Sequence, residues 1–139
     1  MSMVDKITSC GRPVFVVWQN GKACPVVDLR GLNEMIVLDS YPLSYQDEII
    51  SSIYSCSFIS TFDVVKTFGQ MSVATKDRWK TMVKIQKGLY VHNILLQGCS
   101  ISPTYMQRYM DKKLYCHKAY ARCYVNNIVI FLKTFEEYI

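Results

Sequence analysis

The chain has 139 residues, half of them hydrophobic, so it is long enough for one domain with a real core and too short for two comfortable ones. No apolar run approaches membrane-spanning length and the N-terminus lacks the apolar segment of a secretory signal, so we expect an intracellular protein, cytoplasmic or nuclear and not secreted, with no membrane partner. The six cysteines show no Cys-x-x-Cys spacing, which favours buried thiols over zinc ligands or disulfides.

The net charge of +5 fits either a polyanionic partner or a surface that is only well solvated. Its basic residues concentrate in the segments 66–87 and 108–122, where Trp79 and several tyrosines are interleaved with them. Such a mixture can follow a phosphate backbone and stack on bases or sugars. On this pattern alone, nucleic-acid contact and a solvated face are equally supported.

The first predicted element is a β-hairpin. Apolar strands at 14–18 and 25–28 flank a segment whose centre is Asn20 and Gly21. An Asn-Gly pair between apolar runs is the strongest short signal for a tight hairpin turn. We therefore expect an N-terminal hairpin, preceded by an extension at residues 1–13.

A helix and a strand are predicted next. Apolar residues recur at helical spacing near 48–54, and Ser44 with Asp47 can cap the start of that helix. An alternating strand follows at 58–62 and ends at Asp63.

Sequence patterns in the second half of the chain predict a short helix, two hairpins and a longer helix. The β-rich segment 81–96 is broken at Lys87 and Gly88, which indicates a hairpin. Ser102 and Pro103 open a helix that runs toward His117, because proline is tolerated in the first turn. Strands at 120–124 and 128–132 then flank the amides Asn126 and Asn127 at a hairpin tip. This order predicts an α+β fold, with a mainly antiparallel sheet and helices on one face.

The sequence stops at residue 139, where another helix would begin. Either the domain ends at that point or the sequence is a piece of something longer.

Asp63 and the amide pair allow two interpretations. Carboxylates on neighbouring strands are how two-metal phosphoryl-transfer sites hold Mg²⁺. The structural alternative is that Asp63 caps the turn after its strand, and that Asn126 and Asn127 form only a type I′ turn, because Asn tolerates positive φ. The two interpretations agree on the position of these residues and differ in their chemistry.

Six sequence blocks over about nine-tenths of the chain carry a more specific signal. They are VDLRGLN at 27–33, DSYPL at 39–43, TFDV at 61–64, RWKT at 78–81, QG at 97–98 with SP at 102–103 and Gln107, and YVNN at 124–127 followed by IVIFLK. With these blocks, the chain from about Val14 onward resembles the fingers and palm of the reverse transcriptase of gypsy-type LTR retrotransposons. The resemblance implies a right-hand polymerase palm with partial fingers and no thumb, covering 14–139 and truncated at the C-terminus. The activity of that family is RNA-directed DNA polymerisation with two Mg²⁺ ions.

The resemblance also implies roles for single residues. Asp63 matches the first catalytic carboxylate and metal ligand, while Asn126 and Asn127 stand where the Tyr-x-Asp-Asp motif of the family has two more. The implied nucleotide-binding residues are Phe68, Gln97, Lys22 and Arg30. Phe68 corresponds to the aromatic gate against a 2′-hydroxyl, although a core aromatic is an equally ordinary role. The implied nucleic-acid-binding residues are Lys80, Gln107 and Arg108, with RNA template and RNA–DNA duplex as partners and dNTP as a weak one.

Two departures from the family pattern argue against activity. Amides at 126 and 127 carry no charge, so we expect Mg²⁺ binding to be impaired and the metal site left at Asp63 to be weak. Cys24 replaces the arginine that clamps the triphosphate in the family, and Lys22 cannot supply a bidentate fork. We therefore expect a catalytically inactive relative of RNA-directed DNA polymerases. The alternatives are a non-catalytic remnant that binds RNA or RNA–DNA duplex, and a non-functional retroelement relic.

Overall fold

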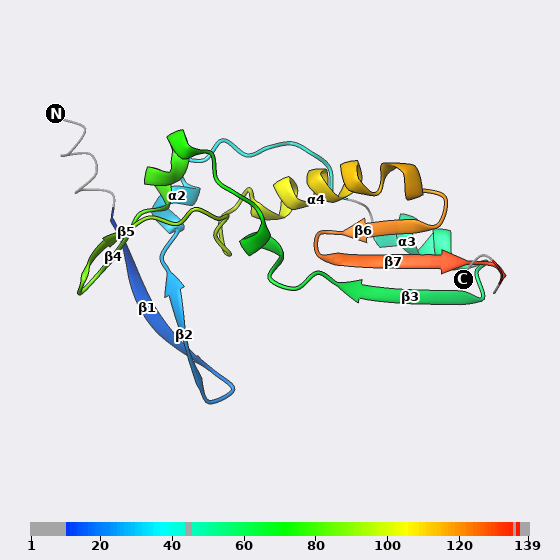
Figure 1. The fold of residues 1–139 in the computed structure, drawn as a ribbon, viewed down its shortest axis with the longest axis horizontal. Coiled ribbons are helices and arrows are strands. Elements are labelled where there is room, and N and C mark those ends of the chain that lie inside the picture. Colours follow the sequence, from blue (N-terminus) through cyan, green and yellow to red (C-terminus); the bar gives the residue numbers. More distant parts are fainter. Residues whose placement is uncertain (1–10, 44–45, 135, 137–139) are drawn as a thin grey trace. The chain divides into compact units, whose positions relative to one another are not determined.

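The structure is a computed structural model that describes residues 11–43, 46–134 and 136 (Figure 1). It divides into two compact units, residues 1–37 with 68–100 (unit 1) and residues 38–67 with 101–139 (unit 2). Unit 1 contains β1 (Arg12–Gln19), β2 (Lys22–Val27), α2 (Arg30–Asn33), a 3₁₀ helix at Thr75–Thr81, β4 (Val83–Ile85) and β5 (Gly88–Tyr90). Unit 2 contains α3 (Gln46–Ile53), β3 (Phe58–Asp63), α4 (Ser102–Lys113), a 3₁₀ turn at Tyr115–His117, β6 (Ala121–Tyr124) and β7 (Asn127–Leu132). A further 3₁₀ turn, Thr67–Gln70, lies where the units join in sequence.

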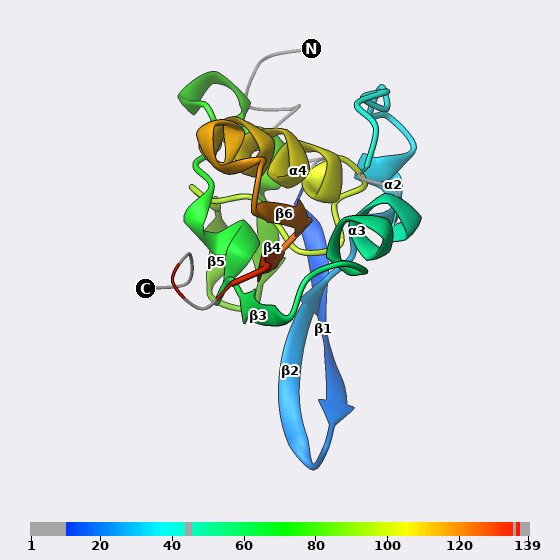
Figure 2. The same cartoon turned by 90° about the vertical axis from the view of Figure 1, so that its right-hand side faces the viewer.

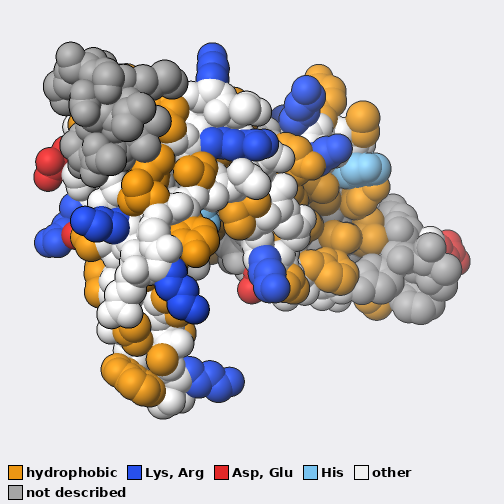
Figure 3. Space-filling model, turned by 60° about the vertical axis from the view of Figure 1, so that its left-hand side comes forward, with side chains coloured by type: hydrophobic (Ala, Val, Ile, Leu, Met, Phe, Trp, Pro, Cys, Tyr) orange, Lys and Arg blue, Asp and Glu red, His pale blue; other side chains and the backbone are white. Residues whose placement is uncertain are grey.

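The predicted N-terminal hairpin is confirmed. Strands β1 and β2 pair antiparallel up to Gln19 and Lys22, which leaves a two-residue turn. Asn20 and Gly21 have φ values of 51° and 73°, as a type I′ turn requires. Figure 3 shows hydrophobic and basic side chains along this projecting hairpin. Trp18, near its tip, is 73% exposed.

The rest of unit 1 completes a sheet of order β2-β1-β4-β5. β4 runs parallel to β1 and antiparallel to β5. The predicted second hairpin is therefore confirmed, but its strands are short. After β5 the backbone bonds to a side chain and not to a strand, since the Thr81 hydroxyl accepts from the His92 amide at 3.0 Å. The core of this unit consists of Leu29, Leu32, Met71, Met82, Val83 and Cys99.

Unit 2 is an antiparallel sheet of order β3-β7-β6 with helices packed near β6. α4 lies against β6, and Figures 1 and 2 show α3 close to the same strand. The helix predicted toward His117 ends at Lys113 and continues as the 3₁₀ turn. The core of the unit consists of Ile49, Met106, Met110, Ala121, Cys123 and Phe131.

Helices mixed with antiparallel sheets confirm the predicted α+β class, with the short β1–β4 pairing as a parallel exception. The predicted cap residue Ser44 lies outside the described residues. None of the helices in the described ranges is long and apolar enough to cross a membrane.

Candidate functional site

The sheet of unit 2 brings Asp63 next to the amide pair. β3 pairs antiparallel with β7 so that Asp63 lies directly opposite Asn127. Residues opposite each other in such a pair stand on the same face of the sheet, because side chains alternate along both strands. The three positions expected to form a catalytic centre, 63, 126 and 127, therefore lie together at one end of the sheet.

The turn between β6 and β7 differs from the predicted one. Tyr124 pairs with Asn127, so the two-residue loop is Val125 and Asn126, and Asn127 is the first residue of β7. Positive φ falls on Val125, at 55°, and not on the asparagines. The prediction of a type I′ turn at Asn126 and Asn127 was wrong. The two-residue loop begins one residue earlier in the sequence, because Tyr124 pairs with Asn127. A β-branched residue at positive φ is an outlier that its surroundings must stabilise.

Asn126 makes a direct contact with the remaining carboxylate. Its Nδ2 donates to Oδ1 of Asp63 at 2.7 Å. An ionised carboxylate only accepts hydrogen bonds, so the amide must present its nitrogen to Asp63. The backbone amide of Val64 also donates to the Asn126 carbonyl at 2.9 Å, which holds the turn to the end of β3. Asn126 thus contributes a donor at the place where a metal ion needs acceptors.

The hydrogen-bond donor that Asn126 presents to Asp63 does not fit the Mg²⁺ site that the resemblance implies. Magnesium is bound by carboxylates and other oxygen ligands. Within the described ranges, no three histidine, cysteine, aspartate or glutamate residues are grouped so that they could hold a metal ion. Cys123, on the adjacent strand, is no substitute, since burial raises the pKa of its thiol to about 11.

Gln107 supports the turn from beneath. Its side chain is fully buried, its Oε1 accepts from the backbone amide of Val125 at 2.8 Å, and its Nε2 donates to the Cys123 carbonyl at 3.0 Å. These bonds satisfy the backbone amide of the strained residue and the carbonyl two positions before it. Because no atom of Gln107 is exposed, it can influence a nucleic acid only through the turn that it holds.

A second layer of polar contacts fixes Gln107. Asp111 accepts from Gln107 Nε2 at 2.9 Å and from the Tyr41 hydroxyl at 2.7 Å. The bond to Asp111 is also the main reason that the pKa of Tyr41 is raised. Arg108 pairs with Asp39, with Nη2 2.6 Å from Oδ2, and its guanidinium lies 4.9 Å from the Tyr41 ring centre. The predicted nucleic-acid residue Arg108 is therefore engaged within unit 2.

The nucleotide-binding residues implied by the resemblance all lie on unit 1. Lys22 is exposed at the hairpin tip, Gln97 is exposed in a loop, and Phe68 is half-buried. Arg30 forms a two-pronged contact with Asp28, with Nη2 2.7 Å from Oδ2 and Nε 3.0 Å from Oδ1. Hydrogen bonds from Arg30 lower the pKa of Asp28 to about 2.

Lys80, also on unit 1, lies 2.5 Å from an oxygen of Asp77. This hydrogen bond lowers the pKa of Asp77. The charges of Arg30 and Lys80 are thus both partly balanced before any nucleic acid binds.

Sequence reasoning gave no role to Asn33, which organises the loop that carries Gln97. Asn33 Nδ2 donates to the Gly98 carbonyl at 3.0 Å and its Oδ1 accepts from the Ser100 amide at 2.9 Å. Gly98 has a φ of 88°, which suits glycine. Asn33 lies in the VDLRGLN block, so the only signal for it was the block itself.

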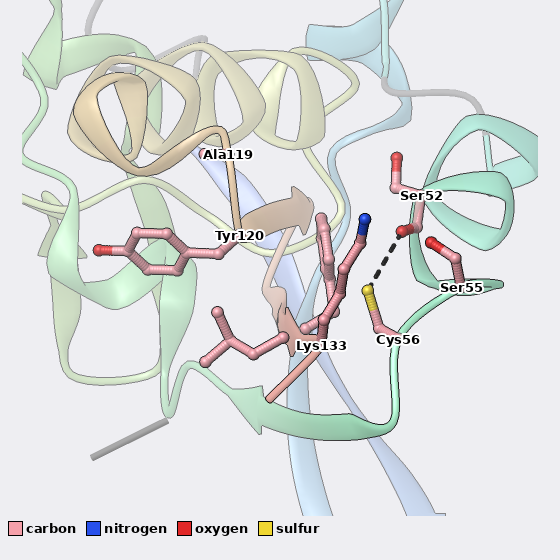
Figure 4. A pocket seen from close by; sticks show the side chains of 8 residues that line it. Ser52, Ser55, Cys56, Ala119, Tyr120 and Lys133 are labelled. Atoms are coloured by element: carbon pink, nitrogen blue, oxygen red, sulfur yellow. Dashed lines mark hydrogen bonds between the residues drawn. The ribbon is translucent and has the colours of Figure 1, made fainter. Parts of the chain in front are cut away.

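A cavity of about 590 Å³ lies on unit 2 at the other end of β3 and β7 from Asp63 and Asn127. Figure 4 shows Ser52, Ser55 and Cys56 on one side of it and Tyr120 on the other. The Cys56 thiol donates to the Ser52 carbonyl at 3.7 Å. Among the described residues that line this cavity none is a carboxylate, and Asp63 is not one of them.

Comparison with known proteins matches residues 18–138 to the family "Reverse transcriptase (RNA-dependent DNA polymerase)". The enzymatic polyprotein of cauliflower mosaic virus (strain Strasbourg) is 27% identical over 121 residues, which cover 87% of this chain and 18% of that polyprotein. The retrovirus-related Pol polyprotein from transposon 297 of Drosophila melanogaster is 29% identical over 115 residues, 82% of this chain and 11% of the polyprotein.

Among solved structures, the foamy viral protease-reverse transcriptase in complex with RNA/DNA hybrid superposes with a TM-score of 0.81 at 20% identity, over 91% of this chain and 17% of that one. This likeness confirms the predicted fingers and palm fold. The chain spans less than a fifth of the length of each of these three proteins. Because the family match covers most of its residues, the chain belongs to the reverse transcriptase (RNA-dependent DNA polymerase) family.

Proposed function

We propose that this chain is a non-catalytic reverse transcriptase module that binds RNA template and RNA–DNA duplex but does not carry out the two-metal nucleotidyl transfer of its family. The observation that carries the proposal is the 2.7 Å hydrogen bond from the Asn126 amide to Asp63. It engages an oxygen of the one retained carboxylate and directs a partial positive charge to the place where a cation would bind.

The size of the electrostatic loss supports inactivity. A unit negative charge ~4 Å from a divalent ion is worth roughly 8 kcal/mol at an effective dielectric constant near 20, before the cost of removing water is subtracted. If about a quarter of that remains as net stabilisation, replacing two carboxylates by amides removes about 4 kcal/mol, or roughly a thousandfold in metal occupancy or rate.

Weak dNTP binding is part of the same proposal. Cys24 stands where the family has a triphosphate-binding arginine, and Arg30 is already held by Asp28 at 2.7 Å. This contact occupies Nε and Nη2 of Arg30 and leaves only Nη1 for a phosphate.

Nucleic-acid binding is supported by the basic charge of the chain and by its relatives. The net charge is +5, and the similar foamy viral enzyme was solved with an RNA/DNA hybrid. Binding through lysine and arginine predicts an affinity that falls steeply with salt and varies little with sequence. We also propose the gypsy-type subclass, from the motif blocks, and an intracellular location.

The decisive experiment is Mg²⁺-dependent primer extension on an RNA template. The parent chain is compared, at equal concentration, with its Asn126→Asp, Asn127→Asp double variant. We expect no extension by the parent and extension by the variant only at high dNTP concentration, because the variant restores the carboxylates of the motif but keeps Cys24. A third protein, the double variant that also carries Asp63→Asn, is the control and should be inactive.

Extension by the parent would overturn the claim of inactivity. The proposed nucleic-acid binding is tested separately. The affinity for an RNA–DNA duplex is measured by fluorescence anisotropy across a salt titration. Absence of binding at low salt, or an affinity that salt does not change, would overturn the proposed binding function.

A further inference from the structure

The outward side of α4 is an unusual surface for a helix of this core. Positions 105, 108, 109, 112 and 113 are all exposed and follow one another at helical spacing, while Met106 and Met110 face the core. The exposed positions are occupied only by tyrosine, arginine and lysine. Beyond the helix, Tyr115 in the 3₁₀ turn and Lys118 just after it are also exposed. The tyrosine–lysine face is defined here as Tyr105, Tyr109, Lys112, Lys113, Tyr115 and Lys118.

The lysines of this face form no ion pair with the described residues, although Lys118 lines a cavity together with Glu48 and Asp111. The acidic residue of α4, Asp111, accepts hydrogen bonds from Tyr41 and Gln107. The adjacent Arg108 is neutralised by Asp39 and is therefore not counted in the face.

Its tyrosine rings are exposed and lie next to the lysines. Tyr105, Tyr109 and Tyr115 are 47%, 41% and 69% exposed. Lys113 Nζ lies 5.6 Å from the Tyr109 ring centre and Lys118 Nζ lies 5.1 Å from that of Tyr115. Residues four apart on a helix are neighbours, so Tyr105 and Tyr109 occupy adjacent positions on this face.

We propose that the tyrosine–lysine face binds single-stranded nucleic acid, with the lysines contacting phosphates and the tyrosine rings stacking on unpaired bases. Aromatic platforms within a basic surface are how proteins bind single strands without sequence preference. An acidic protein would use the lysines and leave several large exposed rings without a role. A single strand uses both kinds of side chain. This surface is distinct from the Asp63 site. The inference rests on the proposed function, which includes an RNA template, and assigns single-strand binding to a surface of its own.

The test uses the full chain and two labelled probes, a short oligouridine and an RNA–DNA duplex of equal length, in fluorescence anisotropy. The variant Lys112→Gln, Lys113→Gln, Lys118→Gln removes the charge of the face. Its matched control, Lys76→Gln, Lys84→Gln, Lys87→Gln, removes the same charge from exposed positions of unit 1. Each phosphate contact on a single strand contributes about 0.7 to the slope of log affinity against log salt, so we expect the slope for oligouridine to fall by about 2 in the face variant and little in the control.

The stacking half is tested with Tyr105→Ala, Tyr109→Ala. Loss of a stacked base weakens single-strand binding by about fivefold or more for each ring. The matched Tyr→Phe double variant, which keeps the rings, should bind as the parent does. Photo-crosslinking of oligouridine should label peptides between residues 105 and 118.

Four results would overturn the inference. One is an equal loss of oligouridine binding in both lysine variants, which would indicate non-specific charge. Another is unchanged binding in the Tyr→Ala variant together with full displacement by polyglutamate, which would indicate a generic acidic partner. If the parent binds the duplex and the face variants bind oligouridine normally, only this inference fails. If the parent binds neither probe at low salt, the proposed function fails as well.

Discussion

Val125 holds the turn of the β6–β7 hairpin in a backbone conformation that valine rarely adopts. Its φ is 55°, and the first position of a two-residue turn with positive φ is normally glycine. Such a conformation costs about 1–3 kcal/mol, and it persists here because Gln107 and the end of β3 hold the turn from two sides.

This strain predicts an unusual ranking of substitutions. At an ordinary position, alanine is more favourable than glycine by roughly 0.5–1 kcal/mol, because glycine loses more backbone entropy on folding. At position 125 we expect Val125→Gly to have the higher free energy of unfolding, by about 1 kcal/mol over Val125→Ala, since only glycine relaxes at positive φ. Urea denaturation of both variants measures the difference. Alanine equal to or above glycine would contradict the assigned turn.

The lowered pKa of Asp28 predicts how its carboxyl group titrates at acidic pH. Its pKa is lowered to about 2, mainly by hydrogen bonds from Arg30. A lowered pKa means that the contact stabilises the folded chain above the ordinary aspartate pKa of about 3.9 and loses this effect as the pH falls through about 2. NMR titration of the carboxyl carbon should therefore place the Asp28 midpoint near 2, and Arg30→Ala should return it toward the ordinary value. Asp77, whose partner is Lys80, should keep its own midpoint in that variant.

At the scale of elements, α4 does more than cover the sheet. Through Gln107 it contacts the carbonyl of Cys123 and the amide of Val125, which lie on either side of the end of β6. Through Asp111 it is tied to Tyr41, 70 positions away in sequence. The helix therefore sets the position of the turn that carries Asn126.

Removing the Gln107 side chain should be costly. Gln107→Ala leaves the part-buried Val125 amide and the buried Cys123 carbonyl without their partner, and each unsatisfied buried group costs about 1–3 kcal/mol. We expect the free energy of unfolding to fall by about 3 kcal/mol. Gln97→Ala, at an exposed position, is the control and should change it by less than about 0.5 kcal/mol. Equal effects of the two substitutions would argue against the network.

At the scale of the whole molecule, the Asn126 amide that bonds Asp63 predicts how the melting temperature responds to magnesium. A ligand that binds the folded state raises the melting temperature, and one that does not bind leaves it unchanged. The parent should therefore melt at the same temperature in EDTA and in millimolar MgCl₂. The Asn126→Asp, Asn127→Asp variant should melt below the parent in EDTA, because it loses the hydrogen bond to Asp63 and gains charge repulsion, and should recover in MgCl₂. A magnesium-dependent rise for the parent, followed by differential scanning fluorimetry, would show that a site survives.

Local patterns in the sequence determined several secondary-structure elements of this protein and its family. The Asn20–Gly21 turn, the strand ending at Asp63 and the helix from Ser102 all follow from neighbouring residues, since turn type and apolar period are set within a few positions. The motif blocks determined the family, which the match over residues 18–138 confirmed.

Only the tertiary structure decided the chemistry of the site. It placed Val125, not the asparagines, at positive φ, and it brought the Asn126 amide to Asp63 across 63 positions of sequence. It also buried Gln107 beneath the turn and joined Asp111 to Gln107 and Tyr41 by hydrogen bonds. The register of a hairpin and the partner of a buried polar group depend on contacts between residues far apart in sequence, and a local pattern holds no information about them.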